Sequence, residues 1–469
     1  MSDEGDNDVA RVRALAADLR RILRSAATVV DEGTPAAELV ARVTGHLGAP
    51  LPELILVTRE FAPWEHVNVH RGVERYLTER GGGHEWFGIA GANRSSEELL
   101  GMLARARREG TFEPGAVDYK TEAVGPDEAE EVVQFGLVET TAPDGTPVLV
   151  AVRGMNPQHG PMATVRFEVL AADRAVAGAV RDRIERLVLA HDVLRGQVLS
   201  FGSSEYRGNE LVTFLPRPKF ASSDVVLPHG VLATIERHTV GIAEHAERLR
   251  AVGQHLKRGL LLHGPPGTGK THTLRYLMGR LDGHTVIILT GGAMRFITKA
   301  AELARRLQPS LLVLEDVDLV AQDRSMGPGT NPLLFSLLDT MDGLGADADV
   351  TFVLTTNRAR DLEKALADRP GRVDLAVEIP KPDAAGRRQL LELYGRDVDL
   401  RADLEPVVAQ TDGVTASFIK ELLRRAVLHQ LHEGVQGHPV PVDDAALARA
   451  LREMNDSRAT LTKSLLGSA

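Results

Sequence analysis

The chain has no cysteine in its 469 residues. Disulfide bonds, thiolate catalysis and cysteine-ligated zinc are therefore excluded. The chain also has no excess of basic charge, because 65 acidic residues outnumber 55 basic ones and give a formal net charge of −10. This balance argues against a protein whose main affinity is for the phosphate backbone of nucleic acid.

Long apolar segments and metalloprotease motifs are also missing. No run of ~18 or more apolar residues occurs, so we expect no membrane span. The first residues, MSDEGDND, are acidic where a signal peptide has positive charge followed by an apolar run, and we expect a cytoplasmic location. His84 and Glu85 begin a metalloprotease-like pair, but the run HEWFG lacks the second histidine, and H-E-x-x-H occurs nowhere in the chain.

The length and composition predict a soluble protein with more than one domain. A chain of 469 residues exceeds what one hydrophobic core usually organises, and its 43% hydrophobic and 26% charged residues are ordinary for globular proteins. The expected segments are an acidic tail at 1–8, an N-terminal α+β domain at 9–200, a Gly-, Ser- and Pro-rich linker at 201–223, a large α/β subdomain at 224–382, a helical subdomain at 383–458 and a tail at 459–469.

Hydrophobic periodicity predicts different elements in the two halves of the chain. In the N-terminal half we expect helices at 9–30, 36–47 and 172–195 and strands at 132–138, 147–152 and 163–170. From about Asp224, short buried strands alternate with helices until Pro380, which is typical of a parallel sheet flanked by helices. Helical patterns then follow at 384–394, 416–431 and 443–454. No catalytic pattern occurs in the N-terminal half.

A phosphate-binding loop follows the apolar run at 260–262. The residues of this loop read GPPGTGKT and precede a helical pattern: Gly264, Pro265, Pro266, Gly267, Thr268, Gly269, Lys270 and Thr271. Its glycines let backbone N–H groups turn toward phosphates, Lys270 is placed to reach the β and γ phosphates of ATP, and Thr271 to ligate Mg²⁺. A glycine-rich turn without a ligand is the alternative, but Lys and Thr in register after a strand argue against it.

Two further strand ends carry polar side chains. The apolar run at 311–314 ends in Glu315 and Asp316, and the run at 351–354 is followed by Asn357. At strand ends beside the phosphate-binding loop, carboxylates serve the metal and the attacking water, and an amide can orient that water. Each signal is weak alone, because an acidic pair is usually a solvated loop, but their order and spacing strengthen them.

The segments that carry these residues resemble the AAA ATPases, in the branch of the p97-like unfoldases, FtsH-type membrane proteases and proteasomal ATPases. The resemblance covers about 224–455. The matching segments read KRGLLLHGPPGTGKT at 257–271, LLVLEDVD at 311–318, LLDTMDGL at 337–344 and TTNRARDLEKALADRPGRVD at 355–374. The resemblance implies the fold class already expected, namely an α/β P-loop AAA module with a C-terminal helical lid, preceded by a mixed α+β N-terminal domain.

The resemblance also implies roles for single residues. Asn357 corresponds to the first sensor, and Arg369 and Arg372 to fingers that reach the nucleotide of a neighbouring subunit, which implies a ring, of six in such relatives. An arginine supplied in trans accelerates hydrolysis roughly 10³- to 10⁵-fold. Gly413 and Ala416 match the lid segment near the adenine and ribose of ATP. By position, Glu315 should hold a water of the Mg²⁺ shell and Asp316 should polarise the attacking water.

The chain departs from most AAA proteins in two places. Relatives read Asp then Glu where this chain reads Glu315 then Asp316, an order similar to that of the mitochondrial AAA translocases that assemble the Rieske protein. Slow turnover is one hypothesis for this swap. In threading relatives an aromatic–aliphatic–glycine loop follows the second strand. Here Phe296 is the nearest candidate, with a plain core position as the alternative, and Thr298 stands in place of the glycine.

The leading hypothesis is therefore an oligomeric ring that hydrolyses ATP with Mg²⁺ and remodels a protein client, which the N-terminal domain selects. A rival hypothesis is a nucleotide switch or assembly scaffold with slow hydrolysis and no threading, which the short pore segment and the acid swap favour. A DNA-dependent ATPase is a third hypothesis that the acidic net charge argues against.

Overall fold

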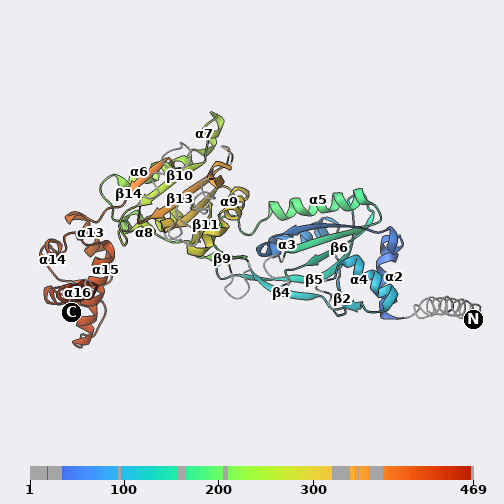
Figure 1. Ribbon diagram of the computed structural model, residues 1–469, viewed down its shortest axis with the longest axis horizontal. Coiled ribbons are helices and arrows are strands. Elements are labelled where there is room, and N and C mark those ends of the chain that lie inside the picture. The colour runs from blue at the N-terminus through green and yellow to red at the C-terminus, as the bar shows by residue number, and fades with distance from the viewer. Residues whose placement is uncertain are drawn as a thin grey trace, which may run out of the picture. The chain divides into compact units, whose positions relative to one another are not determined.

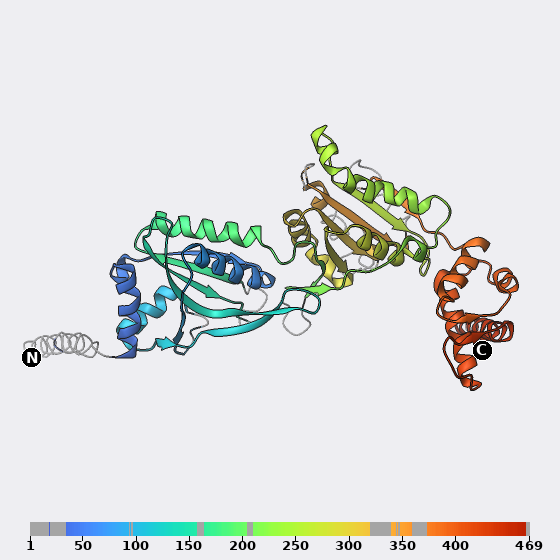
Figure 2. The same ribbon diagram turned by 180° about the vertical axis from the view of Figure 1, so that it is seen from behind.

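The computed structural model divides the chain into two compact units (Figures 1 and 2). Unit 1 comprises Met1–Val193 and Ser203–Leu211, and unit 2 comprises Leu194–Gly202 and Val212–Ala469. The residues that the structure describes are 18, 34–92, 94, 97–156, 164–203, 210–318, 339–343, 345, 348–358 and 373–465. Most of the helix expected at 9–30 lies outside them. Among the described helices, none combines the length and apolarity needed to cross a bilayer.

Unit 1 is built on an antiparallel sheet of seven described strands in the order β1-β7-β6-β5-β2-β3, with β4 also paired to β5. The strands are β1 (Ile55–Phe61), β2 (Trp86–Ala90), β3 (Glu113–Gly115), β4 (Asp118–Ala123), β5 (Ala129–Thr141), β6 (Pro147–Arg153) and β7 (Val165–Ala171). The strands expected at 132–138, 147–152 and 163–170 correspond to β5, β6 and β7. β1 to β4 were not predicted.

Helices cover both faces of this sheet. Its helices are α2 (Pro35–Leu47), α3 (His66–Glu79), α4 (Leu99–Glu109) and α5 (Arg174–Ala190), with short 3₁₀ helices η1 (Leu51–Glu53) and η2 (Pro63–Glu65). Two cores form because successive side chains of β6 point to opposite faces of the sheet. Val150 packs with α3 and α5, whereas Leu149 and Ala151 pack with α2 and α4. The helix expected at 172–195 ends earlier, at Ala190.

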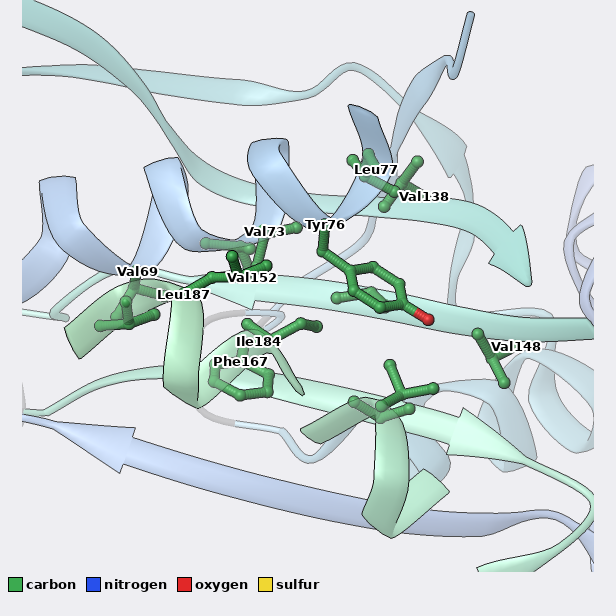
Figure 3. Packing of buried hydrophobic residues seen from close by; sticks show 14 of the residues in the cluster. Val69, Val73, Tyr76, Leu77, Val138, Val148, Val152, Phe167, Ile184 and Leu187 are labelled. Carbon is green, nitrogen blue, oxygen red and sulfur yellow. The ribbon is translucent and has the colours of Figure 1, made fainter. Parts of the chain in front are cut away.

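Hydrophobic side chains of α3 and α5 form a buried core with the sheet, and Tyr76 adds one hydroxyl group to it. Figure 3 shows Val69, Val73 and Tyr76 of α3 turned into the same core as Ile184 and Leu187 of α5. The Tyr76 hydroxyl donates a hydrogen bond of 2.8 Å to the carbonyl oxygen of Thr141, and burial raises the pKa of Tyr76 to about 12. Each fully buried aliphatic side chain here contributes roughly 1.5–3 kcal/mol to folding.

Unit 2 is built on a second sheet of seven described strands, in the order β14-β10-β13-β12-β11-β8-β9. The strands are β8 (Val198–Ser203), β9 (Glu210–Leu215), β10 (Arg258–His263), β11 (Thr285–Thr290), β12 (Ser310–Glu315), β13 (Val350–Thr356) and β14 (Leu375–Glu378). All neighbours from β14 to β8 pair in parallel. The carboxyl ends of β10, β12 and β13 therefore meet at one edge of the sheet, where the expected site residues lie.

The segment expected as a linker, 201–223, contains the end of β8 and all of β9. β8 pairs with β11 and β9 lies beside β8, so this segment extends the sheet of unit 2. β11 would otherwise end the sheet and expose its backbone N–H and C=O groups. Arg217, just after β9, donates hydrogen bonds of 2.6 to 3.3 Å to four carbonyl oxygens, those of Gly196, Met278, Leu281 and His284. These bonds hold the end of the segment against unit 2.

Helices complete unit 2. Those around the sheet are α6 (Val231–Glu244), α7 (Ala246–Ala251), α8 (Lys270–Arg280) and α9 (Ile297–Arg306), with 3₁₀ helices η4 (Ser222–Asp224) and η5 (Gly291–Phe296). A separate helical cluster contains α13 (Ala384–Tyr394), α14 (Leu404–Gln410), α15 (Ala416–His432) and α16 (Asp444–Leu465), with β15 (Asp399–Leu400) paired to β16 (Pro441–Val442). The three helices expected here are present, and α14 was not predicted.

Candidate nucleotide site

The phosphate-binding loop connects β10 to α8, in the context that the sequence predicts. Two of its glycines are required by close packing as well as by their left-handed φ angles. A Cβ atom on Gly264, whose φ is +140°, would lie 2.3 Å from the carbonyl oxygen of Ile379. A Cβ on Gly267, whose φ is +75°, would lie 2.6 Å from Oγ of Ser417. Side chains at these positions would therefore distort the loop.

The ammonium group of Lys270 lies inside this loop. Its Nζ donates hydrogen bonds to the carbonyl oxygens of Gly264 (2.8 Å) and Pro265 (2.9 Å) and to Oδ1 of Asn357 (2.8 Å). Burial lowers the pKa of Lys270, whereas Asp316 and Asp318 raise it. The lysine thus joins the loop to the end of β13, where the sequence places the sensor amide.

Glu315 and Thr271 supply the oxygen atoms that a divalent cation would need. The Glu315 carboxylate accepts a hydrogen bond from Thr271 at the start of α8, and burial raises its pKa. Its other oxygen, Oε1, is buried and has no hydrogen-bond partner among the described residues. A hydroxyl group beside a carboxylate with a free oxygen fits Mg²⁺, which takes oxygen ligands and keeps several waters. These two residues therefore fit the expected metal position.

Asp316 has an unusual backbone conformation. Its φ is +52°, and it is the one non-glycine residue with a positive φ in the described parts of the chain. Aspartate tolerates this left-handed conformation better than most residues, at a cost of roughly 1–2 kcal/mol. The N–H of Asp316 donates a 2.9 Å hydrogen bond to Oγ1 of Thr355, and its carboxylate accepts one of 3.3 Å from Nδ2 of Asn357. The carboxylate of Asp316 is therefore in contact with the amide of Asn357.

Asp318 is a site residue that the motif search missed. Its side chain is buried, and Oδ1 accepts hydrogen bonds of 3.0 Å from the N–H of Asn357 and from Oγ1 of Thr356. This carboxylate therefore fixes the end of β13 and the backbone of Asn357. The signal for it was present, because Asp318 ends the matching segment at 311–318, but its role depends on contact with a different strand.

A cavity of about 940 Å³ opens beside the loop. It is lined by the loop residues Pro266, Gly267, Gly269, Lys270 and Thr271, by Asp316 and Asn357, and by residues of α13 and α15 that include Tyr394, Ala416, Ser417 and Lys420. Ser417 donates hydrogen bonds to the carbonyl oxygen of Gly267 from its N–H (3.1 Å) and its hydroxyl (3.2 Å).

Several expected ligand-binding residues do not line this cavity. Ala416 lines it as expected, but Gly413 does not and instead lies, with φ +69°, in the turn between α14 and α15. Gly264, Pro265 and Thr268 shape the loop from inside. The hydroxyl of Thr268, for example, is buried and donates to the carbonyl oxygen of Pro265 at 2.9 Å. Arg369 and Arg372 lie outside the described residues.

Phe296 packs against an aromatic side chain of unit 2. The ring of Phe296, at the end of η5, lies 5.6 Å from the ring of Phe201 on β8, centroid to centroid. The guanidinium of Arg295 lies 4.7 Å from the same ring. Phe296 is half-buried and Phe201 is fully buried. The alternative that Phe296 is a packing residue is thus supported by its contact with Phe201 on β8.

The fold and these contacts define a P-loop nucleotide-binding protein, with acidic and amide groups at strand ends beside the phosphate-binding loop. Residues 260–381 match the family described as "ATPase family associated with various cellular activities (AAA)". Residues 260–381 therefore form an AAA ATPase domain.

Proteins with similar sequences include a proteasome-activating nucleotidase of Methanosphaerula palustris, 31% identical over 38% of this chain and 47% of that protein. A cell division cycle protein 48 homolog of Archaeoglobus fulgidus is 30% identical over 45% of this chain and 31% of its own length. An ATP-dependent zinc metalloprotease FtsH of Rhodococcus erythropolis is 31% identical over 50% of this chain and 28% of its own length. The chain spans less than half of each of these relatives.

Proposed function

We propose that the chain hydrolyses ATP as a ring, in the cytoplasm, and uses the energy to remodel a protein client. The segments 224–382 and 383–458 serve as its ATPase subdomain and lid, and the N-terminal domain selects the client. The contact of Lys270 with Asn357, and of Asn357 with Asp316, carries this proposal. It brings a cation, an amide and a carboxylate together at the wall of one cavity, as phosphoryl transfer to water requires.

In this proposal each side chain has one task. Lys270 binds the β and γ phosphates, Asp316 accepts the proton of the attacking water, and Asn357 orients that water. Thr271 and Glu315 hold Mg²⁺, which neutralises charge on the phosphates when bound. Arg369 and Arg372 belong to the neighbouring subunit's site, where a guanidinium stabilises the charge that develops at transfer.

An Asp316→Asn variant tests the core of the proposal. The amide cannot take the proton, so we expect this variant to bind ATP and to release phosphate at least 100-fold more slowly than the parent. A client should then stay bound in ATP and elute in ADP, with Lys270→Ala as the control that captures nothing. Phosphate release at the parental rate by Asp316→Asn would contradict the proposed role of this residue.

The ring is tested by mixing two inactive variants. Arg372→Ala keeps an intact phosphate-binding loop, and Lys270→Ala keeps intact fingers, so mixed rings contain some complete sites if the fingers act in trans. We expect each variant alone to be inactive and the mixture to recover part of the parental activity. A mixture that stays inactive although the two variants co-assemble would count against action across the interface.

A second candidate function is a nucleotide switch that hydrolyses slowly and threads nothing. The packing of Phe296 on Phe201 favours this candidate, because an aromatic ring held there is not free to grip a passing chain. The two functions differ in how a client affects the enzyme. Stimulation of ATP hydrolysis by a captured client supports remodelling, whereas an unchanged slow rate with nucleotide-dependent assembly supports the switch.

A further inference from the structure

One row of side chains crosses the sheet of unit 1. In it Glu60 lies opposite Arg166, Arg166 opposite Arg153, Arg153 opposite Phe135 and Phe135 opposite Asp118, on the neighbouring strands β1, β7, β6, β5 and β4. Residues opposite one another in paired strands share a face of the sheet. Two arginines are therefore direct neighbours, an arrangement that is destabilising unless negative charge lies nearby.

Glu168 neutralises only part of this charge. The Arg153 Nε donates a hydrogen bond of 2.9 Å to Oε2 of Glu168, and Arg166 Nε lies 3.4 Å from its other carboxylate oxygen. The Nη1 of Arg153 donates to the carbonyl oxygens of Glu97 (2.8 Å) and Arg94 (3.3 Å). Arg153 is only 6% exposed, and its Nη2 has no hydrogen-bond partner among the described residues. A buried guanidinium nitrogen without an acceptor is costly and points to a ligand or to water.

A small cavity of about 120 Å³ adjoins this guanidinium, and Arg94, Asp118, Gln134 and Gly154 also line it. The Nε2 of Gln134 donates a 3.1 Å hydrogen bond to the carbonyl oxygen of Met155, so the amide is oriented and its Oε1 is an acceptor. This oxygen is buried and also has no partner among the described residues. A Cβ on Gly154 would lie 2.1 Å from it, so glycine keeps the space beside it open.

We propose that this cavity binds a carboxylate group that carries a hydrogen-bond donor beside it. The carboxylate accepts from Nη2 of Arg153, and the adjacent donor, such as an amide N–H, bonds to Oε1 of Gln134. An N-acylated amino acid and the C-terminal residue of a polypeptide both have this chemistry, with one carboxylate next to one N–H. The site is independent of ATP and of the proposed hydrolysis.

The local charge favours a single negative charge on the ligand. The charged residues that line the cavity are Arg94, Arg153 and Asp118, so two positive charges face one negative charge there. The carboxylate of Asp118 already binds Arg94 at 2.6 Å and would repel a dianion such as a phosphate monoester. The ring of Phe135 lies beside both Arg94 and Arg153, at 5.7 and 4.9 Å, and forms an apolar wall.

Isothermal titration of the full chain without nucleotide tests the proposal. We expect N-acetylglycine to bind with a Kd near ~1 mM and N-acetylglycinamide, which lacks the carboxylate, to bind at least tenfold more weakly. Arg153→Gln should weaken N-acetylglycine binding at least tenfold. Because that change leaves the buried Glu168 with Arg166 as its one remaining cation among the described residues and can unfold unit 1, a second variant is needed. Arg94→Gln, at a half-exposed position, is this variant and should also weaken binding. Arg105→Gln is the matched control, since Arg105 is equally exposed on the same unit and lies outside the cavity.

Peptides identify the source of the carboxylate. A peptide with a free C-terminal carboxylate that binds at least tenfold more tightly than N-acetylglycine, and loses that affinity when amidated, indicates the C-terminus of a protein partner. Equal affinity indicates a small free carboxylate. The proposal is overturned if N-acetylglycine produces no heat of binding at concentrations up to ~10 mM, or if Arg94→Gln and a folded Arg153→Gln bind it as the parent does. Water alone then fills the cavity.

Discussion

Lys270 donates a 2.8 Å hydrogen bond to Oδ1 of Asn357, so the phosphate-binding loop and the end of β13 are in direct contact. A lysine ammonium has three N–H donors, and the carbonyl oxygens of Gly264 and Pro265 occupy the other two. A phosphate oxygen that binds Lys270 must therefore replace one of these three acceptors. If it replaces Asn357, the Oδ1 of Asn357 becomes free to accept a hydrogen bond from the attacking water, while its Nδ2 still donates to Asp316.

We predict that Lys270→Ala abolishes ATP binding. The substitution removes the cation that we propose binds the phosphates and leaves the carbonyl oxygens of Gly264 and Pro265 without their donor. Titration of a fluorescent ATP analogue should show at least a 100-fold loss of affinity. Lys381→Ala, at an exposed lysine of unit 2, is the control and should bind as the parent does. Unchanged affinity in Lys270→Ala would refute the assignment of the loop.

Asp318 should act by positioning Asn357. Asp318→Ala leaves the N–H of Asn357 and the hydroxyl of Thr356 without an acceptor, so the sensor amide loses its fixed place. We predict that kcat for ATP hydrolysis falls about tenfold, equivalent to ~1.4 kcal/mol of transition-state stabilisation, while ATP affinity changes little.

Asp318→Asn separates this role from a role of the negative charge. The amide oxygen of asparagine can still accept both hydrogen bonds, so we expect it to restore most of the kcat that Asp318→Ala loses. If both variants lose activity equally, the charge of Asp318 matters and simple positioning is wrong.

The contact between Phe296 and Phe201 predicts how much stability the protein loses when either residue is replaced by alanine. If Phe296 is a packing residue, Phe296→Ala should lower the free energy of unfolding by ~1–2 kcal/mol, because the ring is half-buried. Phe201→Ala, at a fully buried ring, should cost ~3–5 kcal/mol. Chemical denaturation measures both values. Unchanged stability in Phe296→Ala, together with a loss of client-stimulated ATPase activity, would instead indicate a pore residue.

The stability of unit 1 should depend on pH through His70. Burial lowers the pKa of His70 from its ordinary value of 6.5, and Glu74 and Glu130 oppose this shift, whereas His66 and Arg71 add to it. The unfolded chain therefore binds a proton more readily than the folded one. The stability that neutral His70 contributes is present above pH 6.5 and is lost as the pH falls through its folded-state pKa.

Tryptophan fluorescence can measure this effect, because Trp64 and Trp86 are the two tryptophans of the chain and both lie in unit 1. Urea denaturation between about pH 5 and pH 8 should show a smaller loss of stability toward acid in His70→Gln than in the parent. His191→Gln, at an exposed position of unit 1, is the control. An identical pH dependence in parent and His70→Gln would show that other groups cause it.

Local patterns in the sequence were sufficient for much of the nucleotide site. GPPGTGKT predicts a strand, a loop and a helix, because its glycines permit positive φ angles and the lysine must follow them. The spacing of apolar residues predicts the helices at 384–394 and 416–432. Buried strands are short, so the acid pair that follows the apolar run at 311–314 is predicted to lie at the end of a strand. These features depend on residues close together in the chain, so sequence alone determined them.

Tertiary structure decided the rest, because it depends on which distant segments pair. The segment at 201–223 is rich in turn-forming residues, yet β8, which ends inside this segment, pairs with β11. Without β8, β11 would be an unprotected edge of the sheet. Asp318 meets Asn357 only because β12 and β13 are neighbours. Arg153 and Arg166 become neighbours through the register of β6 and β7. Hydrophobic periodicity specifies the faces of a strand but not its partner, so these contacts appear only once the sheets have formed.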